Sequence, residues 1–426
     1  MSKVETRPLR AFADVQLGRM RSPEQAEGPF MVRYLRAANV KDGYLDLSDI
    51  KEMNFTPAEQ HIYSLREGDV LVSEGAGSLA AVGASAVWDG SLDGVVCFQN
   101  TLLRLRPRPA LTSARFLGWW ARHAYASGLL ASTAIGVNIY HLSADRIRGL
   151  PVAFPPLDEQ EAIADFLDRE TARIDRLVSQ REQLISLLGE RRRTVIHQGV
   201  VGLLSADVET HDPGLPWARA VRKPWPAVKI KHVAQLGTGH TPSRAHPEYW
   251  EECTIPWITT GEIQQVRDER AEVITDTREK ISELGLVNSA AELHPAGTVV
   301  LCRTASAGYS AIMGSDMATS QDFATWTCSD RLLPRYLLMC LRAMRSDLLG
   351  RLAFGSTHKT IYMPDIHALK IPLPSIKEQS ETLEGIDSSL ATIDRLSERV
   401  ERQLLALTEH RQAVISAAVT GELKVE

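Results

Sequence analysis

The feature that most constrains the fold of this 426-residue chain is an internal repeat. Residues 155–204 and 374–423 align without a gap at an offset of 219, and eighteen of the fifty aligned positions are identical. A chain that repeats itself in this way contains two copies of one structural unit. The shared anchors are Pro155 and Pro374, the Glu-Gln pairs at 159–160 and 378–379, the IDRL tetrapeptides at 174–177 and 393–396, and Gly202 and Gly421.

Both copies are predicted to be long helices that form a coiled coil. No proline interrupts residues 160–200 or the matching residues 379–419. Apolar residues recur at spacings of four and three, which is the pattern of a coiled-coil seam. A helix of about 40 residues is roughly 60 Å long and needs a partner along its apolar stripe. We expect the two copies to pair within one chain; pairing between two chains, or ordinary amphipathic helices, are the alternatives. The seam residues are Ile163, Leu167, Ile174, Leu177, Leu184 and Leu188, followed by Ile386, Ile393, Leu396, Val400, Leu407 and Val414.

The segments before the two helices are expected to be globular. Strand-like runs such as Val70–Val72 are mixed with one apolar helix candidate in each segment, which favours an α+β fold. The predicted fold is two mixed α/β globular domains separated by two long antiparallel helices that form a rod, with a pseudo-twofold internal repeat. Its parts are globular residues 1–154, helical residues 155–204, a linker at 205–225, globular residues 226–373 and helical residues 374–426.

Composition narrows the possible functions. The five cysteines form no C-x-x-C pair, so we expect neither a disulfide framework nor a metal site. No secretory signal and no membrane-spanning run is expected, which favours a cytoplasmic protein without a membrane partner. The net charge of −5 counts against a nucleic-acid-binding protein. The acidic excess lies in the two repeated segments, however, and a nearly neutral globule can still present one basic face.

Catalytic signatures are missing. Neither GxxxxGK[ST] nor HExxH occurs. The string nearest to the N/D/S-P-P-[FYW] loop of amino-methyltransferases is residues 154–157, FPPL, which lacks the polar first residue and the aromatic last one. Residues 75–80 fit GxGxxA, but no βαβ unit surrounds them, so a glycine-rich loop is the preferred interpretation. We therefore expect no cofactor on this chain and a function in recognition and assembly.

The order of these parts resembles the DNA specificity subunit of type I restriction–modification enzymes. The repeated P-[PS]-[LI]-x-EQ…IDRL segments are similar to the conserved regions of that family. In the first globule, VRYLRAANVKDGYLDLSDIKEMNF and FQNTLLRLR look like a target-recognition domain. In the second, LGTGHTPSRAHPEYW and IPWITTGEI look like another branch of the same domain type. The resemblance covers nearly the whole chain, and its strength lies in the order and duplication of the motifs.

The resemblance implies a non-catalytic subunit that binds double-stranded DNA with a bipartite site. Each globule would bind one half-site, and the antiparallel helices would hold the half-sites at a fixed separation. Two modification subunits would carry S-adenosylmethionine and methylate adenine, and restriction subunits would translocate DNA with ATP. A catalytic DNA-modifying enzyme and a coiled-coil scaffold that binds only proteins are the alternatives. The missing motifs disfavour the enzyme, and two divergent globules disfavour the scaffold.

Polar residues on loops of the two globules are the candidates for DNA contact, because such side chains hydrogen-bond to base edges. The alternating Arg104, Arg106 and Arg108 are interpreted as the outer face of an edge strand, and the IDRL motifs as packing and ion-pair elements within the rod. The candidates in the first globule are Arg19, Arg21, Arg36, Asn39, Lys41, Ser73, Ser78 and Asn138. Those in the second are Thr238, His240, Thr241, Ser243, Arg244, Thr259, Arg303, Tyr309, His358 and Lys359.

Overall fold

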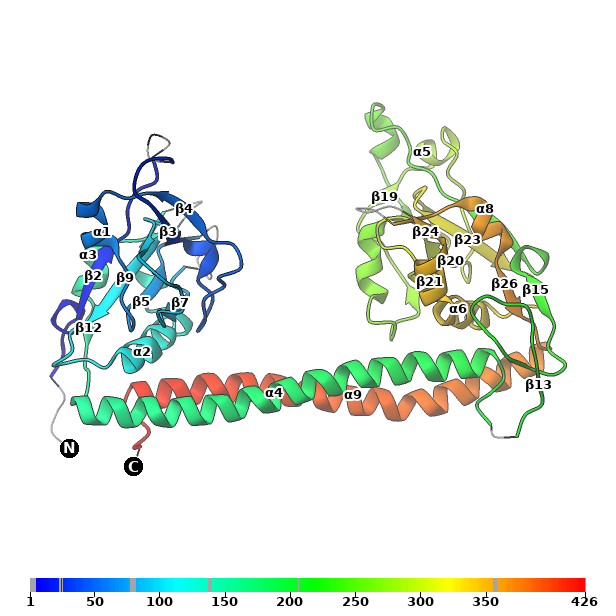
Figure 1. Ribbon diagram of the computed structural model, residues 1–426. Coiled ribbons are helices and arrows are strands. Elements are labelled where there is room, and N and C mark those ends of the chain that lie inside the picture. The colour runs from blue at the N-terminus through cyan, green and yellow to red at the C-terminus, as the bar shows by residue number, and fades with distance from the viewer. Residues whose placement is uncertain are drawn as a thin grey trace. The chain divides into compact units, whose positions relative to one another are not determined.

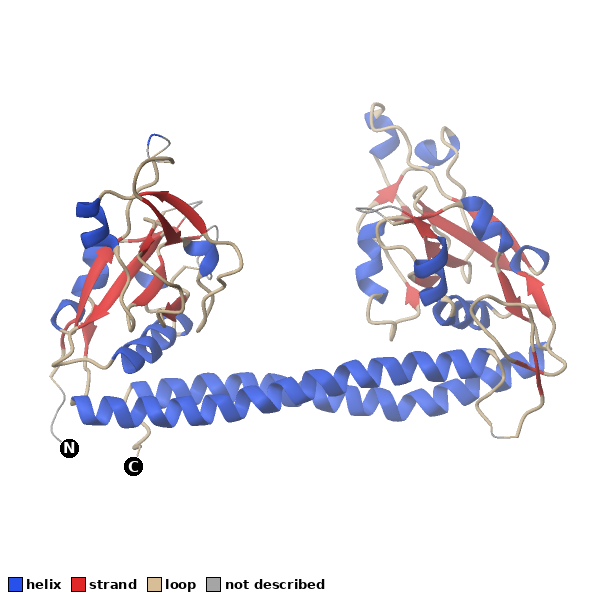
Figure 2. Ribbon diagram, viewed as in Figure 1, coloured by secondary structure: helices blue, strands red, loops and turns tan. Residues whose placement is uncertain are grey.

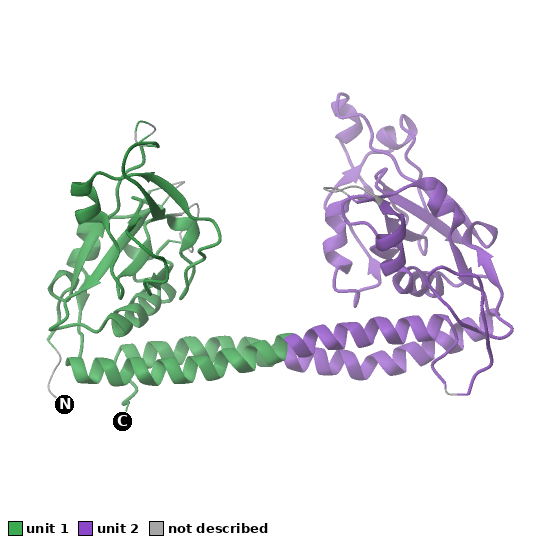
Figure 3. Cartoon of the chain, in the orientation of Figure 1, with its two compact units in different colours: residues 1–182, 402–426 green, residues 183–401 purple. Residues whose placement is uncertain are grey.

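The computed structural model divides the chain into two compact units (Figure 3). Unit 1 comprises residues 1–182 and 402–426, and unit 2 comprises residues 183–401. Each unit holds one globule and one half of each long helix. The structure describes residues 5–22, 24, 26–76, 82–136, 140–205, 207–354 and 359–425, with the side chains of residues 76 and 354 excepted.

The globule of unit 1 is built on a twisted antiparallel sheet with strand order β2-β9-β5-β7. A second sheet, β4-β3-β8, pairs β3 and β8 in parallel, and helix α2 covers the first sheet (Figures 1 and 2). The strands are β1 (Arg7–Pro8), β2 (Ala13–Leu17), β3 (Met31–Leu35), β4 (Lys51–Asn54), β5 (Val70–Ser73), β6 (Gly75–Ala76), β7 (Ser85–Val87), β8 (Val96–Phe98), β9 (Leu102–Pro107), β10 (Ala134–Ile135), β11 (Tyr140–Leu142) and β12 (Pro151–Val152). The α-helices are α1 (Pro57–Tyr63), α2 (Ala114–Ala126) and α3 (Ala144–Gly149).

The globule of unit 2 repeats this plan. Its main sheet has the order β16-β23-β20-β21-β18, and β17 pairs with β22 in parallel as β3 does with β8. The strands that follow the linker are β15 (Ala227–Lys229), β16 (Ala234–Thr238), β17 (Ile255–Ile258), β18 (Val273–Ile274), β19 (Lys280–Ile281), β20 (Val299–Cys302), β21 (Ser310–Met313), β22 (Ala318–Thr319), β23 (Phe323–Cys328), β24 (Ala353–Phe354), β25 (Thr360–Ile361) and β26 (Lys370–Pro372). The α-helices are α5 (Glu283–Val287), α6 (Pro334–Ala343), α7 (Arg345–Asp347) and α8 (Met363–Ala368).

The packing of each globule follows from its sequence pattern. Residues 70–72 of β5 and all four residues of β20 are apolar and buried, because both faces of each strand are covered. Ser113 precedes helix α2 and caps it, because its hydroxyl accepts a hydrogen bond from the Phe116 N–H. Helix α6 begins with Pro334, a residue suited to the first turn because it has no N–H to leave unpaired.

Two helices of 44 residues, α4 (Leu157–Val200) and α9 (Ile376–Val419), carry the repeated segments. In unit 1 the first part of α4 packs with the last part of α9, through residues such as Leu167 and Ile415. In unit 2 the last part of α4 packs with the first part of α9, through residues such as Ile196 and Ile386. The pairing within one chain is therefore antiparallel. The predicted fold class, with two α+β globules and two long paired helices, is confirmed.

The predicted seam needs correction at two positions. Ile163, Leu167, Ile174, Ile386, Ile393 and Val400 are buried, and Leu177, Leu188, Leu407 and Val414 are half-buried. Leu184 and Leu396, in contrast, are 36% and 45% exposed. On α9 the buried positions step through Leu390, Ile393, Ser397 and Val400, so Ser397 takes the place assigned to Leu396. The side chains of adjacent residues point in directions about 100° apart around a helix. The position along the helix therefore decides which residue faces the partner helix, even where its apolar neighbour does not.

Residues 205–225, predicted as a linker, are partly folded into unit 2. Strand β13 (Thr210–His211) pairs with β14 (Val221–Arg222), and Leu215, Val221 and Trp225 join the apolar core of the unit. The Trp225 indole N–H donates to the Glu378 carboxylate at 3.0 Å. None of the helices that the structure describes has the length and hydropathy of a membrane span.

Candidate nucleic-acid interface

A basic groove with a volume of about 490 Å³ opens on the globule of unit 1. Arg21, Arg36 and Lys51 supply three cationic side chains to its wall, against one acid, Glu52. The polar side chains of Gln99 and Thr101 line the same groove. Cations beside neutral hydrogen-bonding groups are what a DNA duplex requires, because cations bind phosphate and amides or hydroxyls bind base edges.

An acidic residue holds two of these cations in place. The Asp49 carboxylate accepts from the Arg36 guanidinium, and it lies 2.7 Å from the Lys51 ammonium. The hydrogen bond from Lys51, together with the charges of Lys51 and Arg36, lowers the pKa of Asp49 against the opposing effect of desolvation. The carboxylate therefore stays ionised at neutral pH and occupies the kind of position between two cations that a phosphate oxygen can take.

Strand pairing brings the groove residues together from distant parts of the sequence. Strands β3 and β4 are antiparallel, with Tyr34 opposite Lys51, and Arg36 follows directly after β3. Gln99 follows β8, which lies on the other side of β3. Gly18 packs against the Gln99 backbone so closely that a Cβ atom there would lie 2.2 Å from the Gln99 carbonyl oxygen. The groove therefore requires glycine at position 18.

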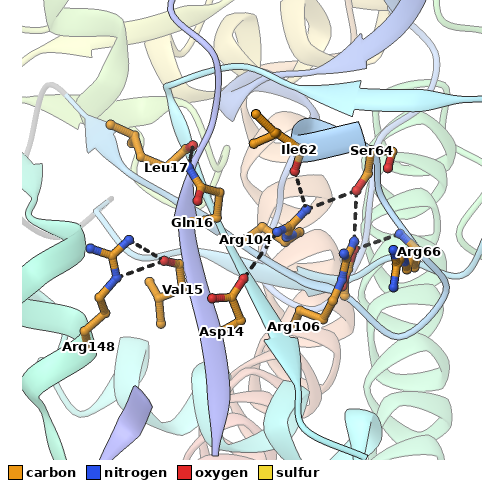
Figure 4. A network of polar contacts seen from close by, with 11 residues as sticks. Asp14, Val15, Gln16, Leu17, Ile62, Ser64, Arg66, Arg104, Arg106 and Arg148 are labelled. Carbon is orange, nitrogen blue, oxygen red and sulfur yellow. Dashed lines mark hydrogen bonds and ion pairs between the residues drawn. The ribbon is translucent and has the colours of Figure 1, made fainter. Parts of the chain in front are cut away.

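Several arginines of this globule serve the fold instead of the groove (Figure 4). Strand β9 lies between β2 and β5, so the predicted edge-strand position of Arg104 and Arg106 is wrong. Arg104 is buried and donates to the Ile62 and Ser64 carbonyls at 3.0 and 3.1 Å, and burial lowers its pKa. Arg106 makes a two-pronged contact with the buried Asp69 carboxylate, with both distances 2.7 Å. These guanidinium groups tie the segment after α1 to the main sheet.

Three of the predicted DNA-contacting residues of unit 1 are also structural. Arg19 is 5% exposed, bonds the Glu59 carboxylate at 2.7 Å and lies over the Phe55 ring. The Asn39 amide is buried and organises the loop after β3 through hydrogen bonds to the backbone of residues 36, 46 and 49. Ser73 is buried in β5. The prediction that these three residues contact DNA bases is wrong, because their side chains are buried.

The remaining candidates of unit 1 have different surroundings. Arg21 and Arg36 line the groove, Arg21 with its side chain exposed. Lys41 is half-buried and does not line the groove. Ser78 and Asn138 lie outside the described residues.

In unit 2 a polar cluster surrounds Gln321, at the turn between β22 and β23. The Thr241 hydroxyl donates to the Gln321 amide oxygen at 2.6 Å, and the Arg303 Nε donates to the Gln321 carbonyl at 2.9 Å. His240 is exposed, and its N–H donates to the Thr319 carbonyl at 2.9 Å. The structure therefore brings three predicted residues, Thr241, Arg303 and His240, to one place.

The other candidates of unit 2 are dispersed or engaged. Arg244 is exposed, lies 3.5 Å from the Trp250 ring centroid and pairs with Glu279 at 2.7 Å. The Thr238 hydroxyl donates to the Phe323 carbonyl, and Tyr309 lies under the Arg345 guanidinium. Ser243 and Lys359 are exposed, Thr259 is half-buried, and His358 lies outside the described residues.

Three polar residues of the groove and of the unit 2 cluster were not among the predicted DNA contacts: Lys51, Gln99 and Gln321. A usable signal existed, because a glutamine stands in the short turn before an apolar strand in both globules, in the strings FQN at 98–100 and SQD at 320–322. The strand register matches Gln99 with Ser320 and Gln321 with Asn100, so the two glutamines stand one position apart and the strings do not align glutamine to glutamine.

A buried glutamine anchors each globule to a long helix. Gln160 and Gln379, from the repeated Glu-Gln pairs, are fully buried. The amide of each makes three hydrogen bonds to backbone groups, two of which join the start of α4 or α9 to the segment just before α2 or α6, while the third closes on the proline before the long helix. The partners are Ser113 N–H, Leu111 O and Pro155 O for Gln160, and Leu333 N–H, Arg331 O and Pro374 O for Gln379.

The chain is similar to known proteins in sequence and in fold. The chain is 22% identical to the EcoKI specificity subunit of Escherichia coli K12 over 403 residues, covering 92% of this chain and 82% of that protein. It is 28% identical to the MjaIX specificity subunit of Methanocaldococcus jannaschii over 184 residues, which cover 43% of this chain and 41% of that protein. A solved chain from work on complex assembly and conformational transition of the type I R-M system shares its fold, with a TM-score of 0.67, 16% identity and 98% coverage of both chains.

The family model described as the type I restriction modification DNA specificity domain matches residues 1–186 and again residues 222–405. The two matches fall on the two repeated halves, and together they cover most of the sequence. The chain therefore belongs to the family of type I restriction modification DNA specificity domains.

Proposed function

We propose that this chain is the specificity subunit of a type I restriction–modification complex and that each globule reads one half of a bipartite DNA site. The observation that carries the proposal is the basic groove of unit 1, which cationic side chains line together with the Gln99 amide and the Thr101 hydroxyl. Unit 2 presents a polar cluster at the matching turn of the same fold. The two sets of side chains differ, as expected of domains that read different half-sites.

The two long helices supply the link between the readers. Linking two weak readers raises the effective affinity of the second binding event without any new contact. Because α4 and α9 each contribute to both units, we expect them to determine the separation of the half-sites, with the base pairs between left unread. Half-sites about one helical turn apart would present the same face of the duplex to both readers.

The chemistry is expected on partner subunits. We expect two modification subunits that carry S-adenosylmethionine and methylate adenine, and restriction subunits that use ATP to translocate DNA. The target adenine must leave the stack to reach a methyltransferase pocket. The acidic excess of the helices makes them poor binders of phosphate and suits them to contact with partner subunits. We expect such a DNA-bound complex to act in the cytoplasm.

The charge of the chain bears on its affinity. Phosphate neutralisation supplies much of the affinity for DNA, and a chain with a net charge of −5 has no overall positive charge to attract the phosphates. We therefore expect weak binding by the chain alone and tight binding only when a modification subunit adds cationic surface.

Co-expression with the modification subunit from the same genome tests the proposal. Mapping methyladenine across the genomic DNA should reveal a motif of two specified parts with an unspecified gap, present only when this chain is expressed. A continuous motif, or methylation that does not depend on this chain, would contradict the proposal. The first result would favour a single reading domain, and the second a modification enzyme with its own specificity.

A further inference from the structure

The turn that follows β8 and the turn that follows β22 occupy the same place in the two globules. We name residues 99–101 and 320–322 the reading turns. Each begins after a strand that pairs in parallel with its neighbour, β8 with β3 and β22 with β17, and each leads into a central strand, β9 or β23. Their backbone contacts also match, because Gln99 N–H donates to the Leu35 carbonyl and Ser320 N–H to the Ile258 carbonyl, both at 2.9 Å.

A glycine packs against both turns. A Cβ atom on Gly239 would lie 2.4 Å from the Ser320 carbonyl oxygen, and one on Gly18 would lie 2.2 Å from the Gln99 carbonyl oxygen. Since no side chain fits between backbones this close, the segment after β2 or β16 holds each turn in place. A rigid platform of this kind is what precise hydrogen bonding to a base requires.

Each turn carries a glutamine with free hydrogen-bonding capacity, at the first position of residues 99–101 and at the second position of residues 320–322. By the matched backbone contacts, Gln99 corresponds to Ser320 and Gln321 corresponds to Asn100. Gln99 is half-buried and lines the basic groove, and no described residue hydrogen-bonds to its side-chain amide. Gln321 is exposed, and its amide oxygen accepts from the Thr241 hydroxyl at 2.6 Å. That bond orients the amide but leaves one lone pair on the oxygen and, among the described residues, no partner on the nitrogen.

We propose that Gln99 and Gln321 are the specificity-determining residues of the two globules and that each reads an adenine in the major groove. An amide that donates to adenine N7 and accepts from adenine N6 makes a two-pronged contact that other bases do not match. In unit 1, Arg21, Arg36 and Lys51 surround Gln99 with phosphate-binding groups. In unit 2, Arg303 holds the turn through the Gln321 carbonyl. The inference rests on the proposed function, because it names the residues that read each half-site.

The test uses the full chain co-expressed with its modification subunit and compares the methylated motifs of variants. Gln99→Ala should lower discrimination at one adenine position of one half-site by about 5- to 150-fold and leave the other half-site unchanged. Gln321→Ala should do the same in the other half-site. Gln99→Glu should shift the preference at its position from adenine to cytosine, since a carboxylate accepts from cytosine N4.

Two matched controls separate reading from structure. Asn100→Ala removes an amide from the same turn that does not line the groove, and Gln235→Ala removes an exposed glutamine from β16. Both should leave the motif unchanged. The inference would be overturned if Asn100→Ala instead of Gln99→Ala relaxed the specificity at the adenine position. It would also be overturned if the glutamine variants left the motif unchanged or lost methylation uniformly at all sites. A wild-type motif that does not have two parts would overturn the proposed function and this inference with it. If the wild-type motif has two parts but the glutamine variants do not change it, only the inference about the glutamines fails.

Discussion

Arg192 of α4 donates a hydrogen bond to the carboxylate of Asp394 of α9. The same relation occurs in unit 1, where Arg411 of α9 donates to Asp175 of α4 at 2.9 Å. In the aligned repeat these are identical residues at matching positions, so the aspartate of each IDRL motif pairs with an arginine of the other copy. The isoleucine of each motif is buried in the helix pair. The expected role of the motif in packing and ion pairing follows directly from these contacts.

The two ion pairs should differ in strength. The Arg192 side chain is 10% exposed and also donates to the Glu269 carbonyl, whereas the Asp175 side chain is 55% exposed. We expect Arg192→Ala to lower the free energy of unfolding by about 2 kcal/mol, because it removes one partner of a largely buried pair. Arg411→Ala should cost less than about 1 kcal/mol, as exposed pairs do. Urea denaturation of both variants measures the difference, and equal costs would contradict this account.

The buried glutamines Gln160 and Gln379 should contribute more to the free energy of unfolding than a typical polar residue does. Gln160→Ala removes three hydrogen bonds and leaves the Ser113 N–H buried without an acceptor. We expect a loss of about 2–4 kcal/mol in the free energy of unfolding, and the same for Gln379→Ala. Gln180→Ala, on an exposed position of α4, is the matched control and should change stability by less than about 0.5 kcal/mol. Anchor variants as stable as this control would show that the hydrogen bonds do not hold the globules to the helices.

The helices and their pairing could be predicted from the sequence because the signals are local. Apolar spacing, absent prolines and the repeat all act within one segment. The assignment failed at Leu184 and Leu396, where an apolar residue stands one position away from the phase of the helix. Ser397 is buried in the seam because its backbone position faces the core, which residue chemistry does not reveal.

The interface was harder to predict because its geometry depends on contacts distant in sequence. Arg19 and Arg36 are both arginines close to a strand end, yet Arg19 is buried under Glu59 and Phe55 while Arg36 lines the groove. Gln99 reaches that groove only because β8 pairs with β3. Neither fact is visible before the strand register is known.

The cations of the groove should control the salt dependence of DNA binding. Arg21→Ala and Lys51→Ala should each weaken binding of the complex with its modification subunit, because each removes one phosphate contact. The slope of log K against log salt concentration should fall by about 0.9 for each contact removed. Fluorescence anisotropy across a salt series measures the slope. Arg173→Ala, an exposed arginine of α4, serves as the control, and a slope that changes as much in this variant would place the DNA away from the groove.

Stability should decrease in mild acid because desolvation favours the neutral form of two histidines, the half-buried His123 and the buried His294. Desolvation lowers the pKa of His123 and of His294 below the ordinary value of 6.5. Below that pH the unfolded chain binds protons at these side chains that the folded chain does not, so the free energy of unfolding falls as the solution is acidified. Urea denaturation between about pH 7.5 and pH 5 should show this loss, which brackets the ordinary histidine pKa. The variant with both histidines replaced by Gln should show a shallower dependence; an unchanged slope would mean that other groups titrate.

The central claim is that each globule reads its own half of a bipartite DNA site. The most direct test of this claim is to exchange one globule. Residues 1–154 would be replaced by the corresponding segment of another family member with a known motif, and methyladenine would be mapped in cells that also express the modification subunit. The account predicts that one half of the motif changes to that of the donor while the other half stays as it was. A motif that changes in both halves, or in neither, would contradict it.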